Sequence, residues 1–184
     1  MSPFLSKSSK NKLKVLGWYQ IVGGIVGLAV SFWLIFRLGQ VNSLMILIIL
    51  FALGLYGFSI YSGRLLLTDK YNKGLGLTII NQALQVFQFA MLGYGFLYVS
   101  GLMLTVGIKI DNGFNFDFNF ALTSTWNMSI ASSETPFNIS INLVAIYFIY
   151  FSKKLRLTIE EEKTNYEEQE LSEEHGDERL TYEI

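Results

Sequence analysis

The polar residues of this 184-residue chain that stand out for chemistry lie inside an uncharged apolar stretch, in the segment TIINQALQVFQ from Thr78 to Gln88. A helix with 3.6 residues per turn places them within about 120° of one face. Amides at membrane depth cost free energy unless they find partners, so we expect this face to look into a helical bundle or into water. The polar intramembrane face consists of Thr78, Asn81, Gln82, Gln85 and Gln88.

Two interpretations of this face stay open. The amides either make hydrogen bonds between helices, with Gln20, Ser59 or Ser62 as partners, or line a polar pathway or a gating site. The face carries no Asp, Glu or His, so a proton relay or a site for a charged substrate is poorly supported.

Other residues that commonly do chemistry are sparse. The chain has no cysteine, which excludes disulfides, thiolate metal sites and cysteine nucleophiles. The single histidine, His175, lies in the acidic C-terminal segment, and no Gly-rich phosphate loop with Lys-Ser/Thr occurs. Asp111, Asn115 and Asp117 lack the spacing of an EF-hand calcium loop, and a hairpin turn accounts for Asp111. We therefore expect no enzymatic activity, no cofactor and no metal site.

Long uncharged blocks hold these residues, and such blocks are typical of membrane helices. About 20 apolar residues in a helix cross a hydrocarbon core of about 30 Å. We expect four transmembrane helices, at about 15–36, 43–67, 74–99 and 136–157. The first is long enough to be an uncleaved span rather than a signal peptide. Whether the fourth begins as a strand or as a helix stays open, because Phe137–Leu143 alternates in polarity while Thr135-Pro136 is a good helix start.

A ridge of small residues lies on the first span. Gly23, Gly27 and Ser31 recur at steps of four residues. Such a ridge permits close helix approach, either within the bundle or between subunits, and the sequence does not distinguish the two.

The segment KIDNGFNFDFNF alternates Phe with Asn or Asp, which is the period of a half-buried strand. Leu102–Ile110 alternates before it, Asp111-Asn112-Gly113 is a strong hairpin signal, and Trp126–Ile130 alternates after it. We expect an antiparallel sheet of about three strands in a β insert at 102–131. Its expected apolar face comprises Phe114, Phe116, Phe118, Phe120, Trp126, Met128 and Ile130.

The surroundings of this sheet follow from its unpaired edges. An open sheet cannot span a membrane, because its edge amides would be left without partners in hydrocarbon. We expect the sheet to cap the helices, with its apolar face covered by helix ends, the lipid headgroup boundary or a neighbouring subunit.

Basic residues predict the orientation. The N-terminus (1–14), the 64–73 region and the chain after Ser152 hold twelve of the fourteen Lys and Arg residues, and Arg37 and Lys109 lie in the two opposite loops. By the positive-inside rule both termini are cytoplasmic and the sheet is extracytoplasmic. The tail, 158–184, is strongly acidic, and its composition predicts a solvated, disordered segment.

The expected fold class is an α-helical membrane protein with four transmembrane helices and a small extracytoplasmic antiparallel sheet. We expect a multi-pass protein of the bacterial inner membrane that acts without catalysis, through protein–protein contacts, as a subunit or regulator of a membrane assembly. The alternative is a small oligomeric pore lined by the amides of 78–88, and the third possibility is an integral-membrane enzyme of unknown reaction. Expected partners are the lipid bilayer and membrane proteins, including further copies of the chain. Nucleic acid is not expected, and no small-molecule substrate is identified.

Overall fold

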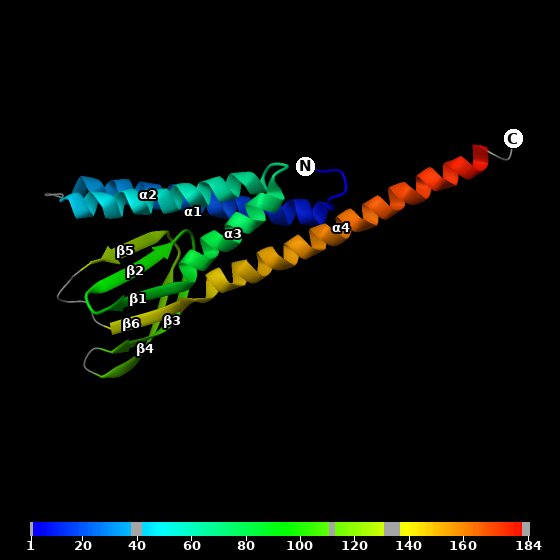
Figure 1. Ribbon diagram of the computed structural model, residues 1–184. Coiled ribbons are helices and arrows are strands. Elements are labelled where there is room, and N and C mark those ends of the chain that lie inside the picture. The colour runs from blue at the N-terminus through cyan, green and yellow to red at the C-terminus, as the bar shows by residue number, and fades with distance from the viewer. Residues whose placement is uncertain (1, 38–41, 111–112, 131–136, 182–184) are drawn as a thin grey trace.

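A computed structural model describes residues 2–37, 42–110, 113–130 and 137–181, with side chains as far as Glu173. Within these residues the chain forms four helices and six strands (Figure 1). The elements are α1 (Lys7–Arg37), α2 (Ser43–Leu66), α3 (Tyr71–Val86), β1 (Phe87–Met91), β2 (Tyr94–Val99), β3 (Met103–Ile110), β4 (Phe114–Ala121), β5 (Thr125–Ser129), β6 (Phe137–Asn142) and α4 (Leu143–Thr181).

The expected fold class is wrong. In place of four transmembrane helices and a three-stranded sheet, the described residues form four helices and one six-stranded antiparallel sheet. Among the described helices, α1 and α2 are long and apolar enough to cross a membrane. The strands expected from alternation are present as β3, β4 and β5, whereas β1, β2 and β6 occupy residues expected to be helical.

The transmembrane helix expected at 74–99 is helical only in its first half. Helix α3 ends at Val86 and the chain continues directly as β1 and β2. The turn between these strands places Leu92 and Gly93 at φ values of 51° and 86°. A right-handed helix cannot pass through this left-handed region. An uncharged apolar run suits a buried strand as well as a helix, so composition alone did not separate the two.

The expected span at 136–157 begins as a strand. Residues 137–142 form β6, and α4 starts directly after it. The Asn142 side chain accepts a hydrogen bond from a backbone N–H in the first turn of α4 at 3.1 Å, as a helix cap does. The alternative start at Thr135-Pro136 lies outside the described residues. Beyond residue 157, α4 continues as a helix to Thr181, through the segment for which composition predicts disorder.

Helices α1 and α2 form an antiparallel hairpin in which the ridge of small residues is buried. A Cβ atom added at Gly27 would lie 2.0–2.4 Å from ring atoms of Tyr56, so the ring fills the notch that this glycine leaves. A Cβ at Gly23 would lie 2.9 Å from backbone atoms of residues 100–101. Ser31 donates its hydroxyl to the Gly27 carbonyl oxygen at 2.8 Å. The ridge therefore packs within the chain, against α2 and the link from β2 to β3.

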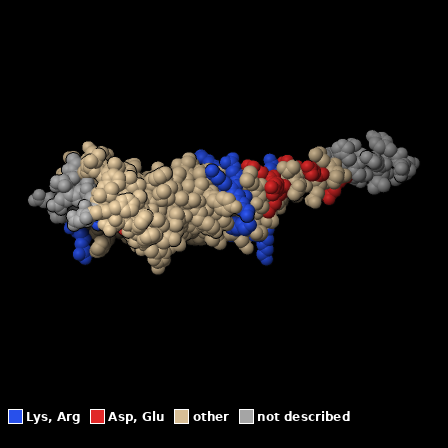
Figure 2. All heavy atoms as spheres, turned by 90° about the horizontal axis from the view of Figure 1, so that it is seen from below, with Lys and Arg blue, Asp and Glu red and all other residues tan. Residues whose placement is uncertain are grey.

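An apolar cluster ties the four helices together at one end of the molecule. Its buried residues come from the segment before α1, from α1, α2, α3 and the middle of α4, and are Leu5, Leu13, Leu16, Leu66, Tyr71, Leu75, Leu155 and Ile159. Basic residues lie close in the chain to the residues of this cluster, and we call them the basic collar: Lys7, Lys10, Lys12, Lys14, Arg64, Lys70, Lys73, Lys153, Lys154 and Arg156. Figure 2 shows a band of Lys and Arg between a largely uncharged body and the acidic part of α4.

The sheet has the strand order β4-β3-β6-β1-β2-β5, so the last strand in the chain lies near its centre. The register gives the sheet two chemically distinct faces. On one face Ile141 of β6 stands between Val106 and Phe87, and on the other Ser140 stands between Gly107 and Gln88. Because this alternation continues across the neighbouring strands, one face is apolar and the other is rich in amides and hydroxyls.

Candidate functional site

The polar face of α3 lies in a buried hydrogen-bond network, and Asn81 is its hub. The Asn81 side-chain nitrogen donates to the Gln20 side-chain oxygen at 3.0 Å and to the Ser59 hydroxyl at 3.2 Å. Its side-chain oxygen accepts the Tyr98 hydroxyl at 3.1 Å. Gln20 in turn donates to the Thr78 hydroxyl at 2.7 Å. One asparagine therefore links α3 to α1, α2 and β2, and a network satisfied in this way favours one packing arrangement.

Gln85 extends the network to the backbone of the link between β2 and β3. Its side-chain oxygen accepts the Ser100 N–H at 2.8 Å, and its nitrogen donates to the Asn81 carbonyl oxygen at 3.2 Å. The Ser100 hydroxyl lies 2.9 Å from that of Ser59. Of the partners expected from sequence, Gln20 and Ser59 take part, whereas Ser62 donates instead to the carbonyl oxygen of Phe58 in its own helix.

Two glutamines of α3 and β1 have little hydrogen bonding. Gln82 is 1% exposed, yet its side-chain nitrogen has no partner. Gln88 is 4% exposed and its nitrogen reaches only the Met103 sulfur, at 3.5 Å, which is a weak acceptor. Gln88 was expected on the helical polar face, but it lies on β1, just after the end of α3, and lines the hollow of the sheet. It therefore belongs to the hollow, while Gln85 belongs to the network between the helices.

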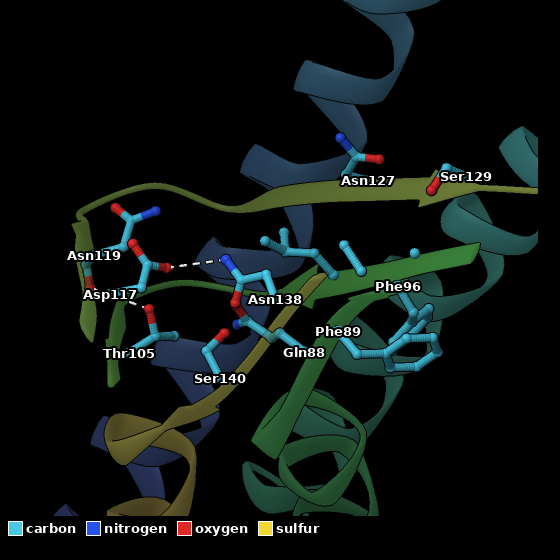
Figure 3. A pocket seen from close by; sticks show the side chains of 13 residues that line it. Gln88, Phe89, Phe96, Thr105, Asp117, Asn119, Asn127, Ser129, Asn138 and Ser140 are labelled. Carbon is cyan, nitrogen blue, oxygen red and sulfur yellow. Dashed lines mark hydrogen bonds between the residues drawn. The ribbon is translucent and has the colours of Figure 1, made fainter. Parts of the chain in front are cut away.

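The hollow is a polar chamber of about 310 Å³ on the concave face of the sheet, and all six strands contribute to it (Figure 3). Its polar lining comprises Gln88, Thr105, Asp117, Asn119, Asn127, Ser129, Asn138 and Ser140. The two edge strands both take part, since Asp117 and Asn119 lie on β4 and Asn127 and Ser129 lie on β5. The sheet is thus curled, with its polar side chains directed inward.

One carboxylate gives the chamber its charge. Asp117 accepts a hydrogen bond from the Asn138 side-chain nitrogen at 3.1 Å, drawn as a dashed line in Figure 3. The Asn138 side-chain oxygen is buried and has no partner in the structure. Among the described residues that line the chamber, Asp117 alone is ionisable. This arrangement presents one carboxylate together with amide and hydroxyl groups, which suits hydrogen bonding to a small polar group or to water.

The remaining predicted residues fall on identifiable surfaces. Phe114, Phe116, Phe118, Phe120, Trp126 and Met128 lie on the face opposite the chamber, and Ile130 follows β5. The four phenylalanines are exposed, whereas Trp126 and Met128 border on α2. Of the weakly supported calcium candidates, Asp117 lies in the chamber and Asp111 lies outside the described residues. No group of three or more His, Cys, Asp or Glu residues that could hold a metal occurs in the described part of the chain.

Sequence reasoning did not identify the chamber. Thr105, Asn119 and Asn127 were expected on the polar face of a small sheet, and Asn138 and Ser140 in the fourth transmembrane helix. The sequence did contain a signal for a polar sheet face, because polar residues occupy every second position in several strands. The segment Phe137–Asn142 is one of them. Only the strand order, which brings distant segments side by side and curls them, turns these positions into one lining.

The fold and the chamber define the class of protein: a long apolar helical hairpin beside a curled antiparallel sheet whose polar face lines an open hollow. No family model, curated protein or solved structure matches this chain.

Proposed function

We propose that the chain is a non-catalytic membrane protein that acts through protein–protein contacts, as a subunit or regulator of a membrane assembly. The observation that carries the proposal is the acidic arm, residues 160–173 of α4. This arm extends beyond all other elements of the molecule (Figure 1). Every residue from Glu167 to Glu173 is exposed.

An isolated helical arm of this kind gains little stability from its own chain. Its described ion pairs, Arg156 with Glu160 and Lys163 with Glu167, both at 3.3 Å, join side chains that are at least half exposed. Such pairs contribute about 0.3–0.5 kcal/mol, and short helices without tertiary contacts are marginal in water. Docking on a partner supplies the missing contacts. The arm carries Glu167, Glu168, Glu170 and Glu173 on this exposed segment, so the partner we infer has a basic surface.

The base of the arm is fixed to the body through Glu162. Its carboxylate accepts the Ser6 N–H at 3.0 Å and the Ser9 hydroxyl at 2.8 Å, at the start of α1. Partial burial raises the pKa of the Glu162 carboxyl, but the hydrogen bonds from Ser6 and Ser9 and the nearby Lys12 charge outweigh this effect, so the pKa is lowered. An ionised carboxylate at a helix N-terminus also interacts favourably with the helix dipole. The arm is therefore held in a defined direction relative to α1.

In this proposal α1 and α2 cross the bilayer, which we infer to be a bacterial inner membrane. Both are long and apolar enough for this role. The basic collar lies at the cytoplasmic surface by the positive-inside rule, and both termini are then cytoplasmic. The arm projects into the cytoplasm, and the far tip of the sheet points to the opposite side.

The topology is tested by single cysteines, because the native chain has none. We expect Asn115→Cys to react with an impermeant thiol reagent in intact spheroplasts, and Ser172→Cys to react only after lysis. The reverse pattern contradicts the proposed orientation. Release of the protein from membranes by carbonate wash contradicts integral membrane residence.

The assembly role is tested by the mass of the particle in nanodiscs made from native membranes. We expect a protein mass above the 20.9 kDa of one chain. Replacing Glu168, Glu170 and Glu173 together by Gln removes the charge and is expected to reduce the particle to a single chain. The matched control replaces the same three residues by Asp, which retains the charge, and is expected to retain the larger particle. A single chain in the native protein, or equal behaviour of the two variants, contradicts docking through the arm.

A pore is the second candidate, favoured by the buried amides of Gln20, Asn81 and Gln85 between the helices and by Gln88 at the chamber. The network argues for a tightly packed interior, because most of these amides bind other protein groups. The test is ion or solute flux in vesicles for the double variant Gln85→Leu, Gln88→Leu. Loss of a native flux with normal assembly supports the pore, and absence of any native flux rejects it.

A further inference from the structure

Contacts with α1 fix the depth at which the sheet lies. Ser124, in the link between β4 and β5, donates to the Gly23 carbonyl oxygen at 2.6 Å, so the near end of the sheet meets the middle of α1. Past the far end of β5, Ile130 borders a cavity shared with Leu34 and Ile35. Residues 23 to 35 span about 18 Å of helix. The sheet therefore runs beside the uncharged part of α1 and not beyond its end.

The contacts with α2 give the same depth. Strands β2 and β5 border on α2 at Ile48, Phe51, Ala52 and Leu55, which belong to the half of this helix away from the basic collar. Helix α3 and the first part of α4 lie between the basic collar and the near end of the sheet. At that end α3 leads into β1, and β6 leads into α4. Figure 1 shows the sheet alongside the α1–α2 hairpin. If these helices span a bilayer, the sheet lies at hydrocarbon depth.

The face of the sheet away from the chamber suits that environment. Phe114, Phe116, Phe118 and Phe120 are 61–71% exposed. At about 200 Å² for each side chain, they present roughly 500 Å² of apolar surface. The neighbouring strands extend this surface with the exposed residues Phe87, Phe89, Leu104, Ile108, Ile110, Ile139 and Ile141. A patch of this size exceeds what soluble monomers usually leave in water.

The unpaired edges of the sheet are compatible with a bilayer because of the curl. Among the described strands, β4 and β5 each have one neighbour only, and open edges exposed to lipid do not occur in hydrocarbon. Irregular or unpaired backbone is tolerated at this depth where it lines a water-filled cavity. Both edge strands border on the polar chamber, through Asp117 and Asn119 on one side and Asn127 and Ser129 on the other. Polar side chains of both edge strands therefore border the hollow, beside the backbone groups that have no strand partner.

We propose that the convex face of the sheet contacts lipid acyl chains, in the half of the bilayer opposite the basic collar, while its concave face encloses a hydrated chamber. This inference rests on the proposed membrane residence of α1 and α2. Continuity supports lipid over a second protein as the occupant, since the phenylalanine face lies at the same depth as exposed apolar residues of α1 and α2 such as Trp33 and Leu50.

The test attaches a nitroxide spin label to single cysteines in the otherwise cysteine-free chain, reconstituted in phosphatidylethanolamine–phosphatidylglycerol vesicles. Oxygen, which concentrates in hydrocarbon, and a water-soluble nickel chelate report the environment of each label. The sheet positions are Phe118→Cys on the convex face and Asn119→Cys in the chamber. Leu50→Cys, 59% exposed on α2, is the lipid reference, and Glu170→Cys is the water reference.

We expect the label at residue 118 to match residue 50, with high oxygen and low nickel accessibility, and the label at 119 to be shifted toward nickel. High nickel accessibility at 118, as at 170, overturns the inference by placing the sheet in water. Low accessibility of 118 to both reagents overturns it as well, because a protein then covers the face. If residue 50 itself lacks oxygen accessibility, the proposed membrane residence fails, so the two failures are distinguishable.

Discussion

Two glutamines of α3 offer a matched test of the buried network. Gln82 and Gln85 lie three residues apart on one helix, and each is 1% exposed. Gln85 accepts the Ser100 N–H at 2.8 Å, whereas the side-chain nitrogen of Gln82 has no partner. Leucine has a volume close to that of glutamine and cannot hydrogen-bond. Gln85→Leu and Gln82→Leu therefore make the same chemical change in two different hydrogen-bonding environments.

The expected magnitudes follow from the groups left behind. Gln85→Leu leaves the Ser100 N–H buried without an acceptor, and an orphaned buried group costs about 1–3 kcal/mol. Gln82→Leu removes a buried donor that is already unsatisfied, so we expect a change between zero and about 1 kcal/mol of stabilisation. The two variants should therefore differ by about 1–4 kcal/mol in free energy of unfolding.

The assay is unfolding in one detergent, with heat or denaturant, followed by tryptophan fluorescence and checked by circular dichroism. Both variants are compared with the native chain at equal protein and detergent concentrations. Equal stabilities of Gln82→Leu and Gln85→Leu, or greater damage from Gln82→Leu, would show that the hydrogen bond to Ser100 does not matter. Either result refutes the reasoning.

The other predictions address packing, pH and the faces of the sheet. Gly27→Ala should lower the melting temperature, because overpacking against the facing ring costs about 1–3 kcal/mol, whereas Gly57→Ala, with open space around it, should be neutral or stabilising. Glu162 has a lowered pKa, so its contribution to stability should be present above about pH 4.5 and be lost as the pH falls through the lowered value; in acid titrations of the melting temperature, Glu162→Gln should lack this step. Phe118→Ser should destabilise the protein in vesicles by about 1–2 kcal/mol through lost apolar contact, and Asn119→Ser should change little; equal effects in thermal melts would contradict a difference between the two faces.

Alternation of polar and apolar residues predicted β3, β4 and β5, where polar or turn residues mark the ends of the strands. Phe114–Ala121 reads as a strand because Asn and Asp interrupt the phenylalanines at every second position, and it is β4. Gly113 supports the hairpin before it, while Asp111 and Asn112 lie outside the described residues. Local periodicity needs no knowledge of distant partners, which explains this success.

The prediction of a helix where β1 and β2 lie was wrong for a physical reason. The segment Phe87–Val99 contains no charged residue. An uncharged apolar segment of this composition is compatible with a membrane helix and also with a strand that has an apolar face. The turn at Leu92-Gly93 was a weak signal, because leucine rarely adopts positive φ. Four residues of the predicted polar face, Thr78, Asn81, Gln82 and Gln85, lie on α3, since a 3.6-residue period is local, whereas Gln88 lies on β1. Of their partners, Tyr98 lies on a segment expected to be helix and Ser100 lies just after it.

The chamber could not be predicted from the sequence, for a different reason. Whether the polar face of a sheet is concave or convex depends on curl and strand order, and neither is encoded in one strand. We expected the sheet to lie outside the membrane because unpaired edge amides are not tolerated in hydrocarbon. The curl brings Asp117 of one edge strand and Asn127 of the other to a common hollow, which no single strand reveals.

The position of β6 has a consequence for biosynthesis. The hairpins β1–β2 and β3–β4 form from neighbouring residues, but they join only through β6, which the ribosome delivers last among the strands. A nascent chain ending before Phe137 holds two separate pieces, one of β3 and β4 and the other of β1, β2 and β5. Contacts between such distant segments form slowly. The polar hollow is therefore completed late, when β6 enters the gap, and until then the edges of β1 and β3 that face β6 have no strand partner.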